Sequence, residues 1–188
     1  PSRGLGDVYK RQYLDYVQQG IYLWENSPYV KNYPELYFLN YVLFHRTNDE
    51  EIKPCRTYFW KKIKDKVQGK AMVEAALEIN HWCAGEVMYQ GTDMRTGSAL
   101  EIYRSGVGRC GEEAVFVVNV MRSAGIPARP VYVPRWSHCD DNHAWVEVWC
   151  DGDWHYLGAC EPEAVLDKGW FTNAASRACL LYTSPSPR

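Results

Sequence analysis

The sequence predicts an α+β domain in which a central helix packs on one face of an antiparallel sheet. Three observations predict this fold class. The first half of the chain is rich in aromatic residues and shows helical periodicity interrupted at prolines. A well-marked helix follows Gly106, and three strand-like segments follow Pro127. The chain thus has helices first, then one central helix, then a meander of strands. This order is typical of two packed layers.

Both ends of the chain differ from the rest in composition and pattern. Residues 2–12 are one translation of a DNA sequence whose reverse complement encodes residues 179–188. Because the two ends are one DNA sequence read from opposite strands, we interpret 1–12 and 179–188 as sequencing-adapter artefacts on a metagenomic fragment. The informative chain is then a helical N-terminal region at 13–99 and a truncated core at 100–178. The lack of a signal peptide therefore says nothing about export.

Helical segments are expected in order through the N-terminal region. Leu36, Leu39 and Leu43 have the spacing of a buried helical face. The segment at 56–70 repeats apolar residues at helical spacing, and its lysines are interpreted as a solvated face. The segment at 71–90 shows the same periodicity and predicts another amphipathic helix.

The central helix and the strands follow in the second half. The stretch CGEEAVFVVNVMRSAG, at 110–125, is apolar at helical spacing and ends at Gly125. Glu112 and Glu113 fall in its first turn and are interpreted as N-terminal helix charges. Turn residues and alternation predict strands at 128–133, 143–150 and 153–158.

Charge and hydropathy exclude two classes of partner. The chain has 21 Lys and Arg against 23 Asp and Glu, a net charge of −2, and no basic stripe. This balance provides no electrostatic surface for nucleic acid. No apolar run approaches the roughly 20 residues that a membrane span needs, so we expect no span in this fragment.

Cys110 is the candidate nucleophile. It lies at the predicted start of the central helix, where the helix dipole and unpaired N–H groups favour a thiolate. Gly108 and Gly111 leave the sulfur open to approach, and the backbone N–H of Cys110 or its neighbour could stabilise an oxyanion. The alternative is that Cys110 is only a small buried residue.

His143 is the candidate base, because it begins a predicted strand after a polar run. Alternation places His143 and Trp145 on one face of the sheet and Ala144 and Val146 on the other. We expect the histidine at the edge of the sheet, facing the central helix. A Cys and His pair within hydrogen-bond reach can attack an amide carbonyl and pass the acyl group to water or an amine.

Three stretches together resemble the transglutaminase-like superfamily: GVGRCGEEA, AGIPAR and DDNHAWVEVWCDGDWHYLGACEPE. The resemblance covers about residues 100–177. It implies a papain-like fold that uses Cys, His and usually Asp in that chain order, with Cys110 as nucleophile and His143 as general base and acid. It also implies that no cofactor is needed. Likeness to bacterial relatives of the cell envelope indicates an envelope-associated or secreted protein.

The third catalytic position departs from this pattern. The family's Asp ends the strand after the histidine strand, and Gly158 stands at the matching place. Glu161, just downstream, is the best substitute for orienting the imidazolium. The other carboxyl and amide side chains near the histidine in sequence are Asp140, Asp141 and Asn142. A Cys and His dyad without an acid is a further alternative.

Other residues are candidates for supporting roles. Gln90 lies upstream of the nucleophile, where related enzymes place a side-chain oxyanion donor. Trp136, Trp145 and Trp154 are interpreted either as the lining of a substrate groove or as core residues.

The remaining cysteines and histidines leave two other questions. An even number of cysteines outside the adapter segments leaves disulfide pairing open. A rival metal site would draw on His138, Cys139, His143, Cys150, His155 and Cys160. Strand alternation points several of these away from one another, so we expect no metal.

These observations predict a cysteine-dependent amide hydrolase or acyltransferase acting on protein or peptide amides through a thioester, as a cysteine peptidase, an amidase or a protein-glutamine acyltransferase. Hydrolysis is favoured over cross-linking. The competing hypothesis is a catalytically inactive domain that binds a polypeptide or a cell-envelope glycan, and the missing Asp at Gly158 favours it.

Overall fold

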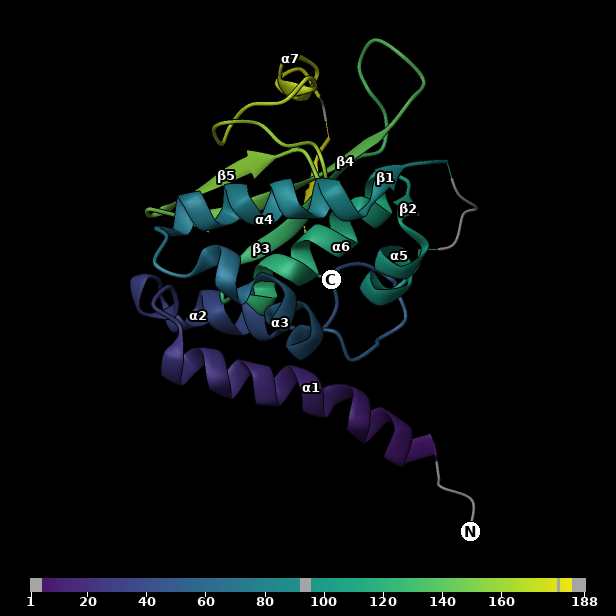
Figure 1. Cartoon of the computed structure of the whole chain (residues 1–188). Coiled ribbons are helices and arrows are strands. Elements are labelled where there is room, and N and C mark those ends of the chain that lie inside the picture. Colours follow the sequence, from purple (N-terminus) through teal and green to yellow (C-terminus); the bar gives the residue numbers. More distant parts are fainter. Residues whose placement is uncertain (1–4, 92–95, 179, 184–188) are drawn as a thin grey trace.

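The computed structural model describes residues 5–91, 96–178 and 180–183. Its helices are α1 (Leu5–Asn26), α2 (Glu35–Phe38), α3 (Arg56–Val67), α4 (Met72–Glu86), α5 (Ala99–Ser105), α6 (Cys110–Ser123) and α7 (Thr172–Ala175), with short helical turns η1 (Val30–Asn32) and η2 (Leu39–Leu43). Its strands are β1 (Met88–Tyr89), β2 (Val107–Gly108), β3 (Ala128–Val133), β4 (His143–Cys150), β5 (Asp153–Leu157) and β6 (Tyr182–Thr183). Figure 1 shows α1 to α6 on one side of the larger sheet and α7 on the other.

The larger sheet is antiparallel, with the strand order β5-β4-β3-β6. In β4, Trp145 pairs with Val131 of β3, and Val146 pairs with Leu157 of β5. The meander and the fold class predicted from the sequence are therefore confirmed. β6, which lies in the segment interpreted as adapter, pairs with the other edge of β3.

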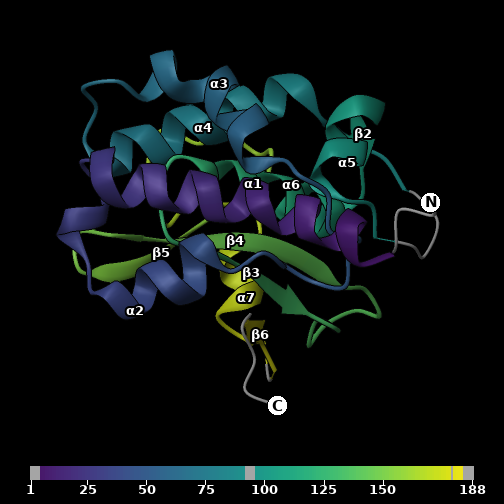
Figure 2. The ribbon, with the colours of Figure 1, turned by 90° about the horizontal axis from the view of Figure 1, so that it is seen from below.

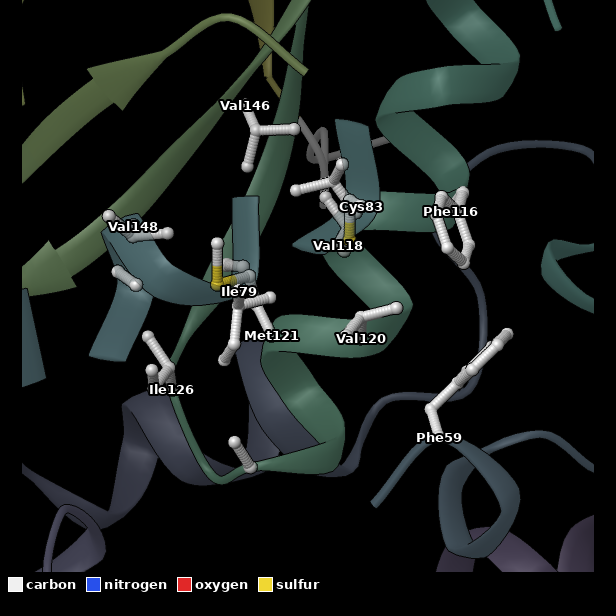
Figure 3. Close-up of a cluster of buried hydrophobic side chains, with 14 of the residues drawn as sticks. Phe59, Ile79, Cys83, Phe116, Val118, Val120, Met121, Ile126, Val146 and Val148 are labelled. Carbon is white, nitrogen blue, oxygen red and sulfur yellow. The ribbon is translucent and has the colours of Figure 1, made fainter. Parts of the chain in front are cut away.

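α6 is the centre of the structure. Every residue from Glu112 to Ser123 is buried, because the sheet covers one side of the helix while α3, α4 and α5 cover the others. Figure 3 shows side chains of α6 lying between Val146 and Val148 of the sheet and Phe59 of α3. A helix enclosed on all sides needs apolar residues around its whole circumference.

α6 ends in a turn that requires glycine. Gly125 has a φ of +83°, and a Cβ there would lie 2.9 Å from Oγ of Ser27. Both the left-handed backbone and the close approach of Ser27 exclude a side chain without strain. This turn redirects the chain from α6 into β3, which returns beneath the helix.

The N-terminal helices complete the core. One hydrophobic cluster runs from Tyr16 of α1 to Ala159 after β5, so the helical region and the sheet share a single core. α1 crosses the underside of the molecule, where it contacts α3 and η2 (Figure 2). No helix among the described residues is long and apolar enough to cross a membrane.

The leucine spacing predicted the wrong buried face in the segment around α2. Leu36 is 64% exposed and Leu39 is 44% exposed, while Phe38 and Val42 are buried. The reason is that α2 is a single turn that passes into a π-helical turn at η2, and the wider turn changes which residues face the core.

Candidate active site

Cys110 is the first residue of α6, and a short parallel pairing fixes the loop before it. The N–H of Met88 donates to the carbonyl of Gly106 at 2.9 Å, and that of Gln90 donates to Gly108 at 2.8 Å. Gly108 packs tightly, since a Cβ there would lie 3.1 Å from Cβ of Glu112. The start of the helix is therefore held in place by its neighbours.

Glu112 lies in the first turn as predicted, but it is buried. Its carboxylate accepts hydrogen bonds from the backbone N–H of Gly97 at 3.1 Å and of Arg109 at 3.2 Å. The Glu112 side chain thus completes a capping box at the helix N-terminus. Its role is to fix the loop that presents Cys110.

The sulfur of Cys110 is half-buried at the end of β4. Burial raises the pKa of the thiol, while hydrogen bonds from the backbone N–H groups of Ala144 and Gly111 oppose this shift. Glu113 raises the pKa further, and Arg109 lowers it. Because burial is the largest of these effects, the resting thiol is favoured over the thiolate.

His143 is the first residue of β4, and the hydrogen bond from the backbone N–H of Ala144 to the sulfur of Cys110 brings the backbone next to His143 close to that sulfur. The imidazole is 7% exposed. Burial lowers the pKa of His143 to about 4, and Asp141 opposes this shift. Nε2 is buried and has no hydrogen-bond partner among the described residues. Burial thus favours the neutral form of both predicted residues, and Nε2 of His143 makes no hydrogen bond to the Cys110 sulfur.

From the sequence we expected the imidazole of His143 to face the central helix. In the structure it faces away from the body of α6. Its ring centroid lies 4.7 Å from that of Trp170, 5.0 Å from Phe171 and 6.1 Å from Trp145. The predicted alternation holds, because Ala144 packs in the core beneath α6 while Trp145 belongs to a second cluster. His143 shares the face of Trp145, opposite the face of the sheet that packs on α6.

Glu161 lies in a tight turn after β5 that faces Gly158. The two residues form an isolated antiparallel bridge. The amide of Asn80 holds the turn by donating to the carbonyl of Gly158 at 2.9 Å and accepting from the N–H of Cys160 at 3.1 Å. A Cβ at Gly158 would lie 2.8 Å from Cβ of Glu161 and against its Oε2. The carboxylate of Glu161 therefore fills the space beside position 158.

Trp170 holds the Glu161 carboxylate. Its Nε1 donates to Oε1 at 3.0 Å and to Oε2 at 3.1 Å. Burial raises the pKa of Glu161, and the hydrogen bond from Trp170 opposes this shift. Among the described residues, no hydrogen bond or ion pair joins Glu161 to His143, and Trp170 contacts both.

Glu113 is a residue of this region that the sequence reasoning interpreted only as a helix charge. It lies in the first turn of α6 and is 4% exposed. Burial raises its pKa to about 8, and Glu161 and Glu112 add to the shift. The available signal was its position in a predominantly apolar helix. At neutral pH the Glu113 carboxyl retains its proton.

The supporting residues have different outcomes. The backbone of Gln90 pairs with Gly108, two residues before Cys110, and its side chain is exposed. Trp136 and Trp145 are buried in the second cluster, with rings stacked at 6.5 Å, so their burial argues against the groove-lining interpretation. Trp154 lies over Arg129 at the far end of β4 and β5.

The alternative acids and the metal site can be examined in the same way. Asp140 pairs with Arg135 at 3.2 Å, and Asp141 accepts the N–H of Asn142, in an exposed loop. Within the described ranges, no three His, Cys, Asp or Glu side chains converge on a common point. The thiols described there are free: Cys55, Cys83, Cys110, Cys139, Cys150 and Cys160.

A cysteine at the N-terminus of a central helix, beside a histidine that opens an adjacent antiparallel strand, defines a papain-like cysteine-enzyme fold. The family model of the transglutaminase-like superfamily matches residues 61–159. The chain belongs to this superfamily.

Comparison with solved structures gives more distant likenesses. A candidate cysteine protease from Cytophaga hutchinsonii is 21% identical, with a TM-score of 0.47, over 68% of this chain and 45% of that one. A candidate protease from Parabacteroides distasonis is 18% identical, with a TM-score of 0.45, over 55% and 22% of the two chains. LapG of Legionella pneumophila is 15% identical, with a TM-score of 0.48, over 79% and 74%.

The chain spans less than half the length of the Cytophaga structure. Since each TM-score is below 0.5, the family assignment rests on the superfamily match alone. No curated protein matches the chain.

Proposed function

We propose that this chain is a cysteine-dependent amide hydrolase or acyltransferase that acts on protein or peptide amides, with hydrolysis as the favoured reaction. The observation that carries the proposal is the placement of the Cys110 sulfur against the N–H of Ala144, the residue that follows His143. A thiol and an imidazole so placed need no metal or organic cofactor for acyl transfer.

The reaction begins from the neutral pair. Because burial lowers the pKa of His143 to about 4, its imidazole is free to accept the thiol proton as Cys110 attacks the carbonyl. The backbone N–H of Cys110, with Gln90 as a candidate side-chain donor, would stabilise the oxyanion. His143 then gives the proton to the leaving amine, and a thioester remains on Cys110. Water or an amine attacks the thioester with His143 again acting as base.

Glu161 is proposed as the acid that supports the imidazolium formed during these steps. Its carboxylate fills the space next to Gly158, at the end of the strand that neighbours β4. A side chain from position 158 and the side chain of Glu161 cannot occupy this space together. This mutual exclusion supports the interpretation that Glu161 replaces the family's Asp.

The test uses p-nitrophenyl acetate, which acylates an activated thiol without requiring the natural substrate. We expect a burst of p-nitrophenol and an acetyl group on Cys110 detected by mass spectrometry. Cys110→Ala should abolish the burst, and His143→Ala should slow it by about 100-fold or more. Cys139→Ala, which removes an exposed thiol, is the matched control and should acylate like the parent.

The same enzyme with β-casein and dansylcadaverine would separate the two reactions. New peptide termini or released ammonia without dye incorporation indicate hydrolysis, whereas incorporated dye indicates acyl transfer to an amine.

One observation favours a second candidate, a catalytically inactive domain that binds a polypeptide or a cell-envelope glycan. No hydrogen bond or ion pair joins Glu161 to His143 in the described part of the chain. In an inactive domain, p-nitrophenyl acetate would acetylate Cys110 no faster than it acetylates an ordinary thiol. The acetylation rate would then not depend on His143.

A further inference from the structure

Asp167 fastens the segment after Glu161 to β5. Its Oδ2 lies 2.6 Å from Nδ1 of His155, and its Oδ1 accepts the N–H of Tyr156 at 2.9 Å. The hydroxyl of Tyr156 donates to the Asp167 carbonyl at 2.6 Å. Asp167 itself has a φ of +60°, a conformation that non-glycine residues adopt only where the surroundings enforce it. The chain is thereby turned back over the sheet.

Phe171 is the anchor of this returning segment. It is fully buried, stacked on Trp145 with a centroid distance of 5.0 Å and tilted against Tyr156 at 5.7 Å. Because Phe171 and Asp167 are both fixed, the position of Trp170 between them is also defined. Trp170 is nevertheless 65% exposed. Its placement is therefore not explained by burial in the core.

Trp170 contacts the two residues that the proposed mechanism needs to couple. Its N–H donates to both oxygens of Glu161, and its ring lies 4.7 Å from the imidazole of His143. An aromatic ring within about 6 Å of a cation attracts it, so this ring favours the imidazolium. A carboxylate that accepts the indole N–H fixes the orientation of the ring and increases its electron density.

We propose that Trp170 is a positioning residue of the site, which couples the Glu161 carboxylate to the imidazole of His143 by donating its N–H to one and presenting its ring to the other. This inference rests on the proposed function, since it concerns the imidazolium formed during acyl transfer. It explains how Glu161 can act on His143 without touching it. Of the other charged groups, Asp141 in the β3–β4 loop raises the pKa of His143, and Glu113 on α6 acts on Cys110.

The test is a double-mutant cycle on the p-nitrophenyl acetate burst, measured as a function of pH. Trp170→Phe keeps a ring and removes the N–H, and Glu161→Gln removes the carboxylate charge. A hydrogen bond to a charged group is lost in either variant, so we expect each to slow acylation by about tenfold and to lower the pH at which the rate reaches half its plateau. In the Glu161→Gln background, Trp170→Phe should then change the rate by at most about twofold.

The matched control is Trp24→Phe, which alters an exposed tryptophan on α1 and should leave the profile unchanged. Circular dichroism and thermal unfolding establish that each variant is folded. A second readout is the indole N–H resonance of Trp170, identified by its loss in Trp170→Phe. In the parent this resonance should shift as Glu161 titrates, and it should not do so in Glu161→Gln.

The outcomes separate the two proposals. No Cys110-dependent burst in the parent would overturn the proposed function and this inference together. A normal parent burst with an unchanged Trp170→Phe profile would overturn the inference alone. An equal slowing by Trp170→Phe with and without the Glu161 carboxylate would also overturn it, because the ring would then act only by packing.

Discussion

Substituting Glu113 by Gln should remove a loss of stability that the parent shows as pH rises. In the folded protein, burial and the nearby carboxyls raise the pKa of Glu113 to about 8, whereas an unfolded glutamate releases its proton near pH 4.5. Between these values the folded state binds more protons than the unfolded state, so the free energy of unfolding falls as pH rises. Each pH unit in this window costs about 1.4 kcal/mol.

From pH 5 to pH 8 the parent should therefore lose on the order of 3 kcal/mol relative to Glu113→Gln. The neutral amide keeps the shape of the protonated carboxyl and does not titrate. The assay is urea unfolding of both proteins at pH 5, 6, 7 and 8. Glu25→Gln on α1, an exposed position, is the matched control and should follow the parent. A stability difference between Glu113→Gln and the parent that does not change with pH would refute a protonated Glu113.

Three further changes test other parts of the structure. Gly158→Asp should destabilise the parent, because its Cβ would lie against both the Cβ and the carboxylate of Glu161. It should be tolerated better together with Glu161→Gly, which removes both. Thermal unfolding and the acylation burst measure this rescue, and equal destabilisation in both backgrounds would contradict the shared space. Burial of neutral His143 predicts that stability falls as pH drops from about 6.5 towards 4, by up to about 3 kcal/mol, and that this fall is smaller in His143→Gln. Gly125→Ala should lower the free energy of unfolding by about 2 kcal/mol or more, because of the φ of +83° and the crowding at Ser27. Gly152→Ala, with a φ of +95° and open space around it, measures the cost of φ alone. Equal losses in urea unfolding would show that the crowding has no effect.

Local sequence patterns were enough to predict most of the fold. Alternation along β4 gave both its strand character and its two faces, because a strand has a side-chain period of two that tertiary packing cannot alter. Gly125 marked the end of α6 for a similarly local reason, its left-handed backbone. Around Leu36 the pattern failed, since the choice between an α-helical and a π-helical turn is decided by packing against the rest of the protein.

The site was predictable where chemistry and backbone position coincide in one residue. Cys110 is the first residue of α6 and His143 is the first residue of β4. The sequence alone could therefore predict that each lies at the start of its element. The contacts of Glu161 depend on Trp170, nine residues later, whose position is set by the turn at Asp167. No spacing rule connects these residues, because the segment between them is irregular. The burial of Glu113 was hidden for another reason: it depends on how closely α6 is enclosed by its neighbours.

The pKa shifts at the site all favour uncharged side chains. Burial raises the pKa of Cys110, Glu113 and Glu161 and lowers that of His143, so every one of these groups is moved towards its uncharged form. A resting ion pair between thiolate and imidazolium would be opposed by the same burial that excludes water. In the proposed reaction, charge would therefore develop only when the substrate carbonyl is attacked and its oxyanion is stabilised by the backbone at the start of α6. In such a site the residues that support the transient imidazolium matter more than those that lower the thiol pKa.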